Sequence, residues 1–401
     1  MIELLYGELK KIFFRKSTII IIFLILLLTV VGTILFNYQY IFLFGDEYRE
    51  VCDKYGGQLT EEKKNELKSL ADSWKDSMGN ELIYRRNILN QLEQIENRKD
   101  YVNYISVQGK ELEQYGLERD DKHIIKKGKF IQVLHENEKN PVFVNNIEYW
   151  CIVQLSVLYL LVLLGIIFLV GNSFSLESTY NMFEILNTTP NGRIKLKCAK
   201  ILAVFCSVLM LNIIFFCFLI LMLKGFGYGL QNLNAPLYVL ENFEKAASSM
   251  TIGRFFMYSI IAQMILSLVW STILMFFSKI TNSFITSMVL GFIGVLGSSY
   301  FEIDYFLRNI GWIKILEGYS LQELSFIKYQ KAFNPMSYLN PAYYFETSRY
   351  GEIGGQLLKI YYFPMIVSVI IMIILGAYLI WGEKYISNRR RIKDGSFDKG
   401  I

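Results

Sequence analysis

Six long stretches of the sequence contain no Asp, Glu, Lys or Arg, and they constrain the fold more than any other feature. They cover residues 17–45, 149–176, 201–223, 255–278, 280–301 and 360–382. About 20 apolar residues in a helix cross the roughly 30 Å hydrocarbon core of a bilayer. Hydrophobic residues make up 53% of the chain and charged residues only 19%, which is too apolar for an ordinary soluble protein. The sequence therefore predicts an all-α membrane protein with six transmembrane helices.

Basic residues are distributed unevenly over the remaining segments, and this predicts the orientation of the chain. Short loops rich in Lys and Arg resist translocation across a membrane. Residues 1–16, 177–200 and 383–401 are rich in both, whereas the short loop 224–254 contains few. We therefore expect a multi-pass protein of the cell membrane, with both termini and the loop 177–200 in the cytoplasm and the loop 224–254 outside.

Two further segments are expected on the outer side. Residues 46–148 are densely charged, and their apolar positions recur at helical spacing over about 60–104 and over about 118–137. This pattern predicts one long helix and a second helix packed against it, as an extracellular helical hairpin domain between the first two spans. Residues 302–359 are half-apolar and are expected to form short helices along the outer interface.

The sequence contains few residues of the kinds that perform catalysis or bind metals. Its two histidines, His123 and His135, do not have the spacing of metal ligands, and no GxxxxGK(S/T) phosphate loop occurs. Cys52 and Cys151 fall near the outer ends of the first two spans, and their spacing leaves open whether they pair. We expect no catalytic residue, metal site or directly bound cofactor in this chain.

The polar residues inside the six runs are all neutral. Transporters driven by protons or ions normally carry ionisable side chains within the bundle. The candidates for a substrate path here are the amides Asn212, Gln263 and Asn282, and the same side chains would also serve as ordinary hydrogen-bonding groups between helices. If the protein moves a solute uphill, its energy is therefore expected to come from a partner.

The N-terminal segment has the pattern of an amphipathic helix. Leu5, Leu9, Ile12 and Phe13 recur on one face at helical spacing, while the charged residues, Glu8 among them, fall mainly on the other. Such a helix is expected to lie in the inner interface of the membrane. The alternative is an ordinary basic flank of a signal anchor.

The loop 177–200 is expected to contain the start of a second helical element. Thr189 is suited to cap, and Pro190 to begin, a helix that runs into the third span. The segment before Thr189 then forms a short helix across the cytoplasmic face. This segment would act as a lever between a soluble partner and the spans.

At these residues the chain resembles type-2 ABC transporter permeases. The first cytoplasmic loop of that family has a similar order of an acidic residue, a Leu-containing turn, Thr-Pro, Arg and Lys, found here as Glu177, Glu184, Ile185, Leu186, Thr189, Pro190, Arg193 and Lys200. The N-terminal segment resembles the elbow helix of the family, and residues 337–344 resemble its outer Asn-Pro turn. One departure is Ser178-Thr179-Tyr180, where the family often has Gly-Thr. The insert 46–148 resembles a trait of permeases linked to peptide-antibiotic export or self-protection.

The resemblance implies the non-catalytic membrane subunit of an ATP-driven exporter. ATP and Mg would be bound by a separate nucleotide-binding ATPase chain, docked on the elbow helix and on the residues Glu177, Phe183, Glu184, Ile185, Leu186, Thr189, Pro190 and Arg193. A second permease subunit, identical or different, and membrane lipids are the other implied partners, and no nucleic acid is expected. The implied substrates are amphipathic, peptide-like or lipid-like, and antimicrobial peptide resistance is the implied role.

A membrane-anchored receptor or scaffold is the alternative function. In that case residues 46–148 bind an external ligand and the spans serve only as an anchor. A single span would be sufficient for an anchor, so the six apolar runs favour the exporter.

Overall fold

The computed structural model describes residues 2–77, 79–135, 140–145, 147–171, 173–175, 194–225, 230–240, 243–281, 283–309, 334–339, 345, 350–353, 356–359 and 361–394. Its elements in chain order are α1 (Ile2–Phe13), α2 (Lys16–Tyr55), β1 (Gly57–Gln58), α3 (Glu61–Ser73), α4 (Asn80–Glu118), α5 (Lys122–His135), β2 (Val142–Phe143), α6 (Ile147–Val170), α9 (Lys195–Gly225), η1 (Leu237–Val239), α10 (Ile252–Thr281), α11 (Phe284–Asn309), η2 (Pro335–Leu339), β3 (Tyr350–Ile353), β4 (Gln356–Lys359) and α13 (Tyr362–Asp394). The predicted all-α class is confirmed, and the strands found among the described residues form two short antiparallel pairs.

Five helical segments are long and apolar enough to cross a membrane: Lys16–Tyr38, Cys151–Val170, Lys195–Gly225, Ile252–Thr281 and Tyr362–Gly382. Their outward faces carry large apolar side chains that are exposed in the isolated chain, such as Phe23 on α2 and Ile373 on α13. Extended apolar surfaces of this kind are unfavourable in water and favourable against hydrocarbon. The protein is therefore membrane-embedded, as the sequence predicts.

The fifth predicted run, 280–301, is divided between two helices. Ile280 and Thr281 belong to the end of α10, and the apolar part of α11 covers Phe284–Gly297, which is shorter than the other five segments. Helix α11 continues to Asn309 without a break, so its apolar run leads directly into a more polar stretch. Within the residues that the structure describes, five candidate spans are thus found where six were expected.

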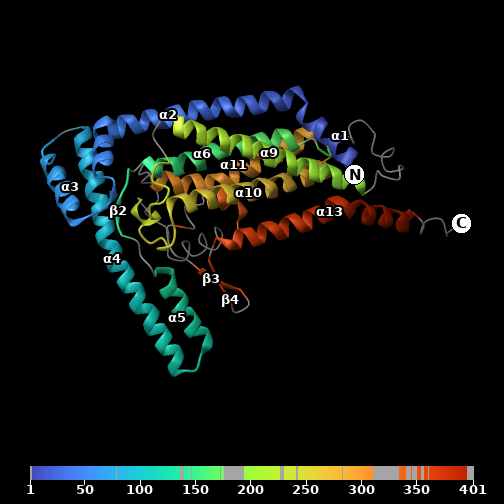
Figure 1. Ribbon diagram of the computed structural model, residues 1–401. Helices are drawn as coiled ribbons and strands as arrows, with labels where there is room; N and C mark the ends of the chain where they lie inside the picture. Colours follow the sequence, from blue (N-terminus) through green and yellow to red (C-terminus); the bar gives the residue numbers. More distant parts are fainter. Residues whose placement is uncertain are drawn as a thin grey trace.

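Helix α10 lies at the centre of the bundle and packs against α6, α9, α11 and α13 (Figure 1). Its contact with α11 depends on Gly294, because a Cβ atom at this position would overlap the indole ring of Trp270. Small residues allow helix backbones to approach closely in membranes, where dispersion contacts drive helix association. The central position of α10 means that a movement of any neighbouring helix changes its packing.

The insert between α2 and α6 is helical, but the single long helix expected over about 60–104 is wrong. The chain reverses between α3 and α4 at Gly79, whose φ of 84° is favourable only for glycine. The ring of Trp74, which follows α3, then packs edge-on against Tyr84 of α4, with 5.9 Å between the centroids. Apolar positions that read as one continuous stripe therefore lie on two helices that face each other.

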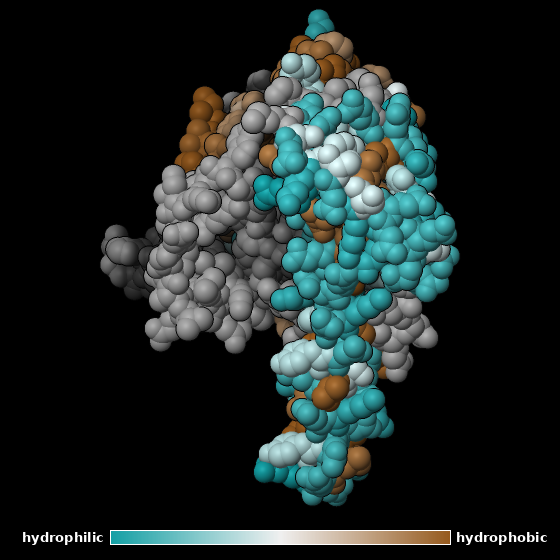
Figure 2. Space-filling model, turned by 90° about the vertical axis from the view of Figure 1, so that its left-hand side faces the viewer, coloured by the Kyte–Doolittle hydropathy of each residue, from teal (hydrophilic) through white to brown (hydrophobic). Residues whose placement is uncertain are grey.

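Helices α4 and α5 form a hairpin. Asp120 takes a φ of 51° in the turn, and the Asp121 side chain accepts hydrogen bonds from the backbone N–H groups of His123 at 2.9 Å and Ile124 at 3.3 Å, which begins α5. Figure 1 shows this hairpin projecting sideways from the end of the bundle opposite both termini, and Figure 2 shows that the outward surface of the insert is mostly hydrophilic.

Short helices were expected throughout the segment 302–359, but its described part also contains two strands. Its described part includes the end of α11, the short helix η2 and an antiparallel pair in which Tyr350 of β3 lies opposite Lys359 of β4. The sequence places Gly354-Gly355 between these two strands, and a two-residue Gly connection is typical of a tight β-hairpin. The helical expectation overlooked this turn signal.

The first prediction concerns the glycine that allows α4 and α5 to approach. A Cβ atom on Gly128 would lie 2.7 Å from the Glu113 amide nitrogen and 2.7 Å from the Gly109 carbonyl oxygen. Gly128→Ala is therefore expected to force the two helices apart and destabilise the hairpin by about 1–3 kcal/mol. Hydrogen exchange of the α5 amides should become faster.

Gly7→Ala is the matched control, because no atom lies within 4 Å of a Cβ at this helical position. It should leave the exchange of α5 unchanged. Equal exchange in wild type and Gly128→Ala would show that close backbone contact does not hold the hairpin together.

Candidate functional site

The structure describes the predicted sites only in part. The predicted ATPase-docking residues Glu177, Phe183, Glu184, Ile185, Leu186, Thr189, Pro190 and Arg193, and the candidate path residue Asn282, all lie outside the described residues. The elbow residues, the path residues Asn212 and Gln263, residues 173–175 before the loop and residues 194–200 at its end are described. The site can thus be constructed from the elements that adjoin the loop.

The predicted amphipathic helix is α1, and it packs along α9. Leu5, Leu9, Ile12 and Phe13 are all half-buried. Ile12 contacts the buried core of the bundle, and its carbonyl oxygen accepts a hydrogen bond of 2.7 Å from the Thr18 hydroxyl of α2. Helix α1 is therefore attached to both α9 and α2 and does not rest on the membrane interface alone.

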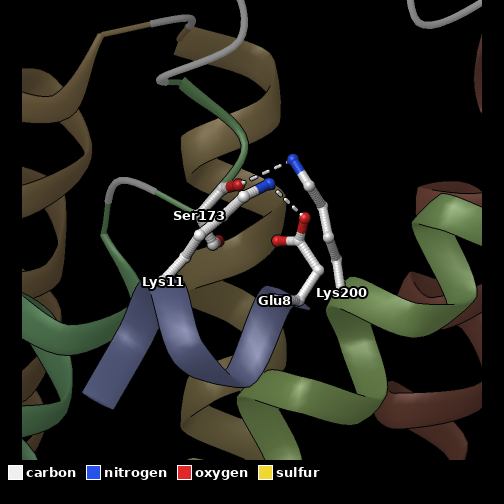
Figure 3. Close-up of polar contacts among 4 residues, drawn as sticks. All are labelled: Glu8, Lys11, Ser173 and Lys200. Carbon is white, nitrogen blue, oxygen red and sulfur yellow. Dashed lines mark hydrogen bonds and ion pairs between the residues drawn. The ribbon is translucent and has the colours of Figure 1, made fainter. Parts of the chain in front are cut away.

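The charged side of α1 differs from the prediction at Glu8. This residue was assigned to the polar face but is only 7% exposed, and its carboxylate forms an ion pair of 2.6 Å with Lys11. Lys200 of α9 comes toward the same place and donates a hydrogen bond of 3.2 Å to the Ser173 carbonyl oxygen (Figure 3). An amphipathic pattern does not contain the packing of α1 against α9, so it could not predict that Glu8 is buried.

Residues 173–175, which lead from α6 into the loop 176–193, are held by two neighbouring helices. The backbone N–H groups of Phe174 and Ser175 donate to the hydroxyl of Ser278 on α10, at 3.2 and 3.1 Å. Lys200 holds the same segment from α9. We call α1, residues 173–175 and the first turns of α9 the inner platform. It fixes both ends of the loop 176–193 against the bundle.

A hydrogen-bond network joins three helices in the middle of the bundle. The hydroxyl of Tyr159 on α6 donates to Asn212 Oδ1 on α9 at 2.7 Å and lies 2.5 Å from the Gln263 carbonyl oxygen on α10. Asn212 in turn donates to the Ser267 hydroxyl of α10 at 3.0 Å. Two of the three predicted path residues, Asn212 and Gln263, are thus brought together by Tyr159, which was not among the predicted site residues.

The side chain of Gln263 extends this network to the segment before α13. Its Nε2 atom donates to the Leu339 carbonyl oxygen at 3.3 Å, and Leu339 ends η2, which packs among α6, α10, α11 and α13. The Oε1 atom of the same amide is buried without a hydrogen-bond partner. Non-helical backbone within a membrane protein is stable only where protein or water satisfies its polar groups. Gln263 provides part of that satisfaction for η2.

Glu148 connects α6 to the loop that follows α9. Its carboxylate accepts hydrogen bonds from the backbone N–H groups of Leu230 at 3.1 Å, Gln231 at 2.8 Å and Asn232 at 3.0 Å. The side chain is fully buried, and a buried carboxylate is stable only when hydrogen bonds of this kind replace its hydration. The sequence analysis assigned no role to this residue.

Arg98 attaches the insert to the same region. The side chain is 2% exposed, and it donates to the Glu244 carbonyl oxygen at 2.8 Å and to the Ser248 hydroxyl at 2.9 Å. Its guanidinium also lies over the ring of Tyr238, 4.7 Å from the centroid. A signal was present in the sequence, since Arg98 continues the apolar spacing of α4 three residues after Ile95.

The two cysteines near the outer ends of the first two spans, Cys52 and Cys151, are buried free thiols. Burial raises the pKa of the Cys52 thiol to about 12, so it remains protonated at neutral pH and reacts slowly. Within the described ranges no cluster of His, Cys, Asp and Glu suited to a metal ion occurs.

Comparison of the chain with models of known protein families, with curated proteins and with solved structures found no match. The geometry of the inner platform and of the central network therefore has to support any proposal on function.

Removal of the Tyr159 hydroxyl tests the central network. Tyr159→Phe leaves Asn212 and the Gln263 carbonyl without this donor. It is expected to lower the free energy of unfolding by roughly 1 kcal/mol, the usual size of such a bond in a membrane protein. Thermal unfolding of the detergent-solubilised protein should occur at a lower temperature. Tyr38→Phe, on an exposed position of α2, is the control and should change nothing. A Tyr159→Phe protein as stable as wild type would contradict a structural role for the network.

Replacement of Arg98 tests the attachment of the insert. Arg98→Met keeps most of the side-chain volume but removes both donated hydrogen bonds. Because the Glu244 carbonyl and the Ser248 hydroxyl then lack a partner, the contact between the insert and the loop is expected to weaken by about 1–3 kcal/mol. Limited proteolysis should cleave the loop 230–252 faster than in wild type. Arg86→Met, at an exposed position of the same helix, provides the matched control. Unchanged proteolysis of both variants would mean that Arg98 does not hold the insert to the loop.

Proposed function

We propose that this chain is the membrane permease subunit of an ATP-driven exporter of the ABC type. The observation that carries the proposal is the inner platform, in which α1 packs on α9 beside both ends of the loop 176–193. This platform lies at the end of the bundle that carries both termini (Figure 1). The inner platform holds the residues on either side of the segment that resembles the docking loop of type-2 ABC permeases.

The platform is suited to transmit force from a soluble partner to the spans. Residues 173–175 are bonded to α9 through Lys200 and to α10 through Ser278, so a push on the loop acts on two helices in addition to α6. Closure of a partner ATPase on ATP and Mg would then shift the packing of the bundle between two arrangements. The chain would itself hydrolyse nothing.

The neutral interior supports an external energy source. Tyr159, Asn212, Gln263 and Ser267 form the central network, and none of them is ionised at neutral pH. Such groups bind polar parts of a solute but supply no proton or ion relay. Asn212 and Gln263 remain candidates for a substrate path that opens when α10 moves.

The complete arrangement that we propose has six spans, with α11 as the fifth. Both termini would lie in the cytoplasm of the cell and the insert 46–148 outside it. Six spans per chain favour pairing with a second permease subunit, and the substrates that the family resemblance implies are amphipathic, peptide-like or lipid-like. Resistance to antimicrobial peptides is the role that fits this substrate class.

A charge reversal in the loop tests the proposal. Glu184→Lys should weaken docking of the ATPase, because the acidic residue of the docking loop becomes basic. The full chain is isolated from its native membrane in nanodiscs, and vanadate-sensitive ATP hydrolysis of the associated material is measured. We expect a loss of about tenfold or more, which corresponds to about 1.4 kcal/mol of binding free energy.

Glu111→Lys, at an exposed position of α4 far from the platform, is the matched control and should retain full activity. Equal ATPase activity in the two variants would remove the loop from the docking surface. A folded chain that brings no ATPase with it would instead favour the receptor, and ligand binding to the insert would be the next measurement.

A further inference from the structure

The position of α5 relative to the bundle indicates what it contacts. Figure 1 shows the α4–α5 hairpin running across the direction of the spans and extending past α13, with α5 on the side of α4 nearer to the spans. Figure 2, in which the end of the bundle that carries the insert faces the viewer, shows the same projection beyond the rest of the chain. Because the membrane plane is perpendicular to the spans, the hairpin lies along the membrane surface beside the bundle.

The exposed residues of α5 form a basic stripe. Lys122, Lys126, Lys129 and Val133 are exposed and recur at intervals of four, three and four residues, which places them on one side of the helix. Gly128, which is in close contact with α4, lies on another side of the helix. The stripe therefore lies beside the close helix contact, on an exposed flank of α5.

Among the ion pairs of the described residues, one involves a stripe lysine. Lys129 lies 3.6 Å from Glu113 of α4, a contact that leaves the lysine side chain 64% exposed. Helix α5 itself contains no Asp or Glu between Lys122 and His135, while it includes a fourth lysine, Lys127. Helix α5 itself thus carries excess positive charge.

We propose that the basic stripe of α5, defined as Lys122, Lys126 and Lys129, binds the phosphate groups of anionic lipids in the leaflet next to the insert. Lysines on one side of a surface helix attract anionic headgroups, and each contributes a factor of about five in binding. The attraction is screened by salt over a Debye length of about 10 Å at 0.1 M. This inference depends on the orientation of the spans in the membrane and is independent of an ATPase partner.

Such binding would fix the far end of the insert. The base of the hairpin is already attached to the bundle through Arg98, and Gln91 of the same helix donates to the Val239 carbonyl oxygen at 3.2 Å. With α5 bound to headgroups, α4 is supported at both ends. The lipid composition next to the insert would then influence the loop after α9.

Lysine acetylation measures the contact in the wild-type protein. The full chain is placed in nanodiscs of phosphatidylcholine, in nanodiscs containing phosphatidylglycerol and in maltoside detergent, and an uncharged acetylating ester is added. Mass spectrometry follows each lysine. The stripe lysines should react about fivefold more slowly with phosphatidylglycerol present. This protection should disappear at 1 M salt, where the Debye length is about 3 Å.

Lys75 and Lys99 are the internal controls, since both are exposed in the insert and lie outside the stripe. Their rates should be the same in both lipids. Equal rates of the stripe lysines in the two lipids, or equal slowing of stripe and control lysines, would overturn the proposal. Protection that persists in detergent would also overturn it, because a protein surface such as a second copy of the chain would then cover the stripe.

A variant removes the stripe without disturbing the hairpin contact. Lys122→Gln with Lys126→Gln leaves the pair between Lys129 and Glu113 in place, and hydrogen exchange of α5 should rise about threefold or more in phosphatidylglycerol nanodiscs while remaining unchanged in detergent. Lys75→Gln with Lys99→Gln is the charge-matched control. Equal exchange of the two double variants in anionic nanodiscs would contradict binding by the stripe.

Discussion

The bundle depends on the contact of α6, α9 and α10 around the hydroxyl of Tyr159. In a bilayer the hydrophobic effect does not drive helices together, so close packing and interhelical hydrogen bonds must do so. One hydroxyl lies within hydrogen-bond distance of a side-chain oxygen of α9 and a backbone carbonyl of α10, which share its single proton, and Gln263 carries the same network to η2. Helices α2 and α13 pack around this centre and leave most of their surface to lipid.

The buried ionised groups lie at the two ends of the bundle, whereas the neutral network lies in its middle. Glu148 and Arg98 are buried at the end that carries the insert, and Glu8 and Lys200 at the end that carries the termini. Each of them binds backbone groups or an opposite charge, which compensates the loss of hydration. Neutral hydrogen bonds thus join the spans in the middle of the bundle, while the charged groups make their contacts near its two ends.

The spans could be predicted from the sequence because hydropathy depends on composition over a long window and needs no knowledge of contacts. The break at Gly79 could not, since the periodicity of α3 and α4 is the same whether they form one helix or two that face each other. Glu8 shows a related limit: an amphipathic pattern assigns charge to solvent, whereas Glu8 is buried and pairs with the exposed Lys11. Glu148 and Arg98 depend on backbone groups some 82 and 146 residues away in the sequence, which no local pattern contains.

Helix α2 is continuous from Lys16 to Tyr55, although only its first part is apolar enough to lie in the membrane. A helix of 40 residues is about 60 Å long, so a tilt of about 5° moves its far end by roughly 5 Å. Its near end is bonded to α1 through Thr18, and its far end leads directly into the insert. A small rotation imposed on α1 would therefore be magnified along this rigid rod into a displacement of the insert on the opposite side of the membrane.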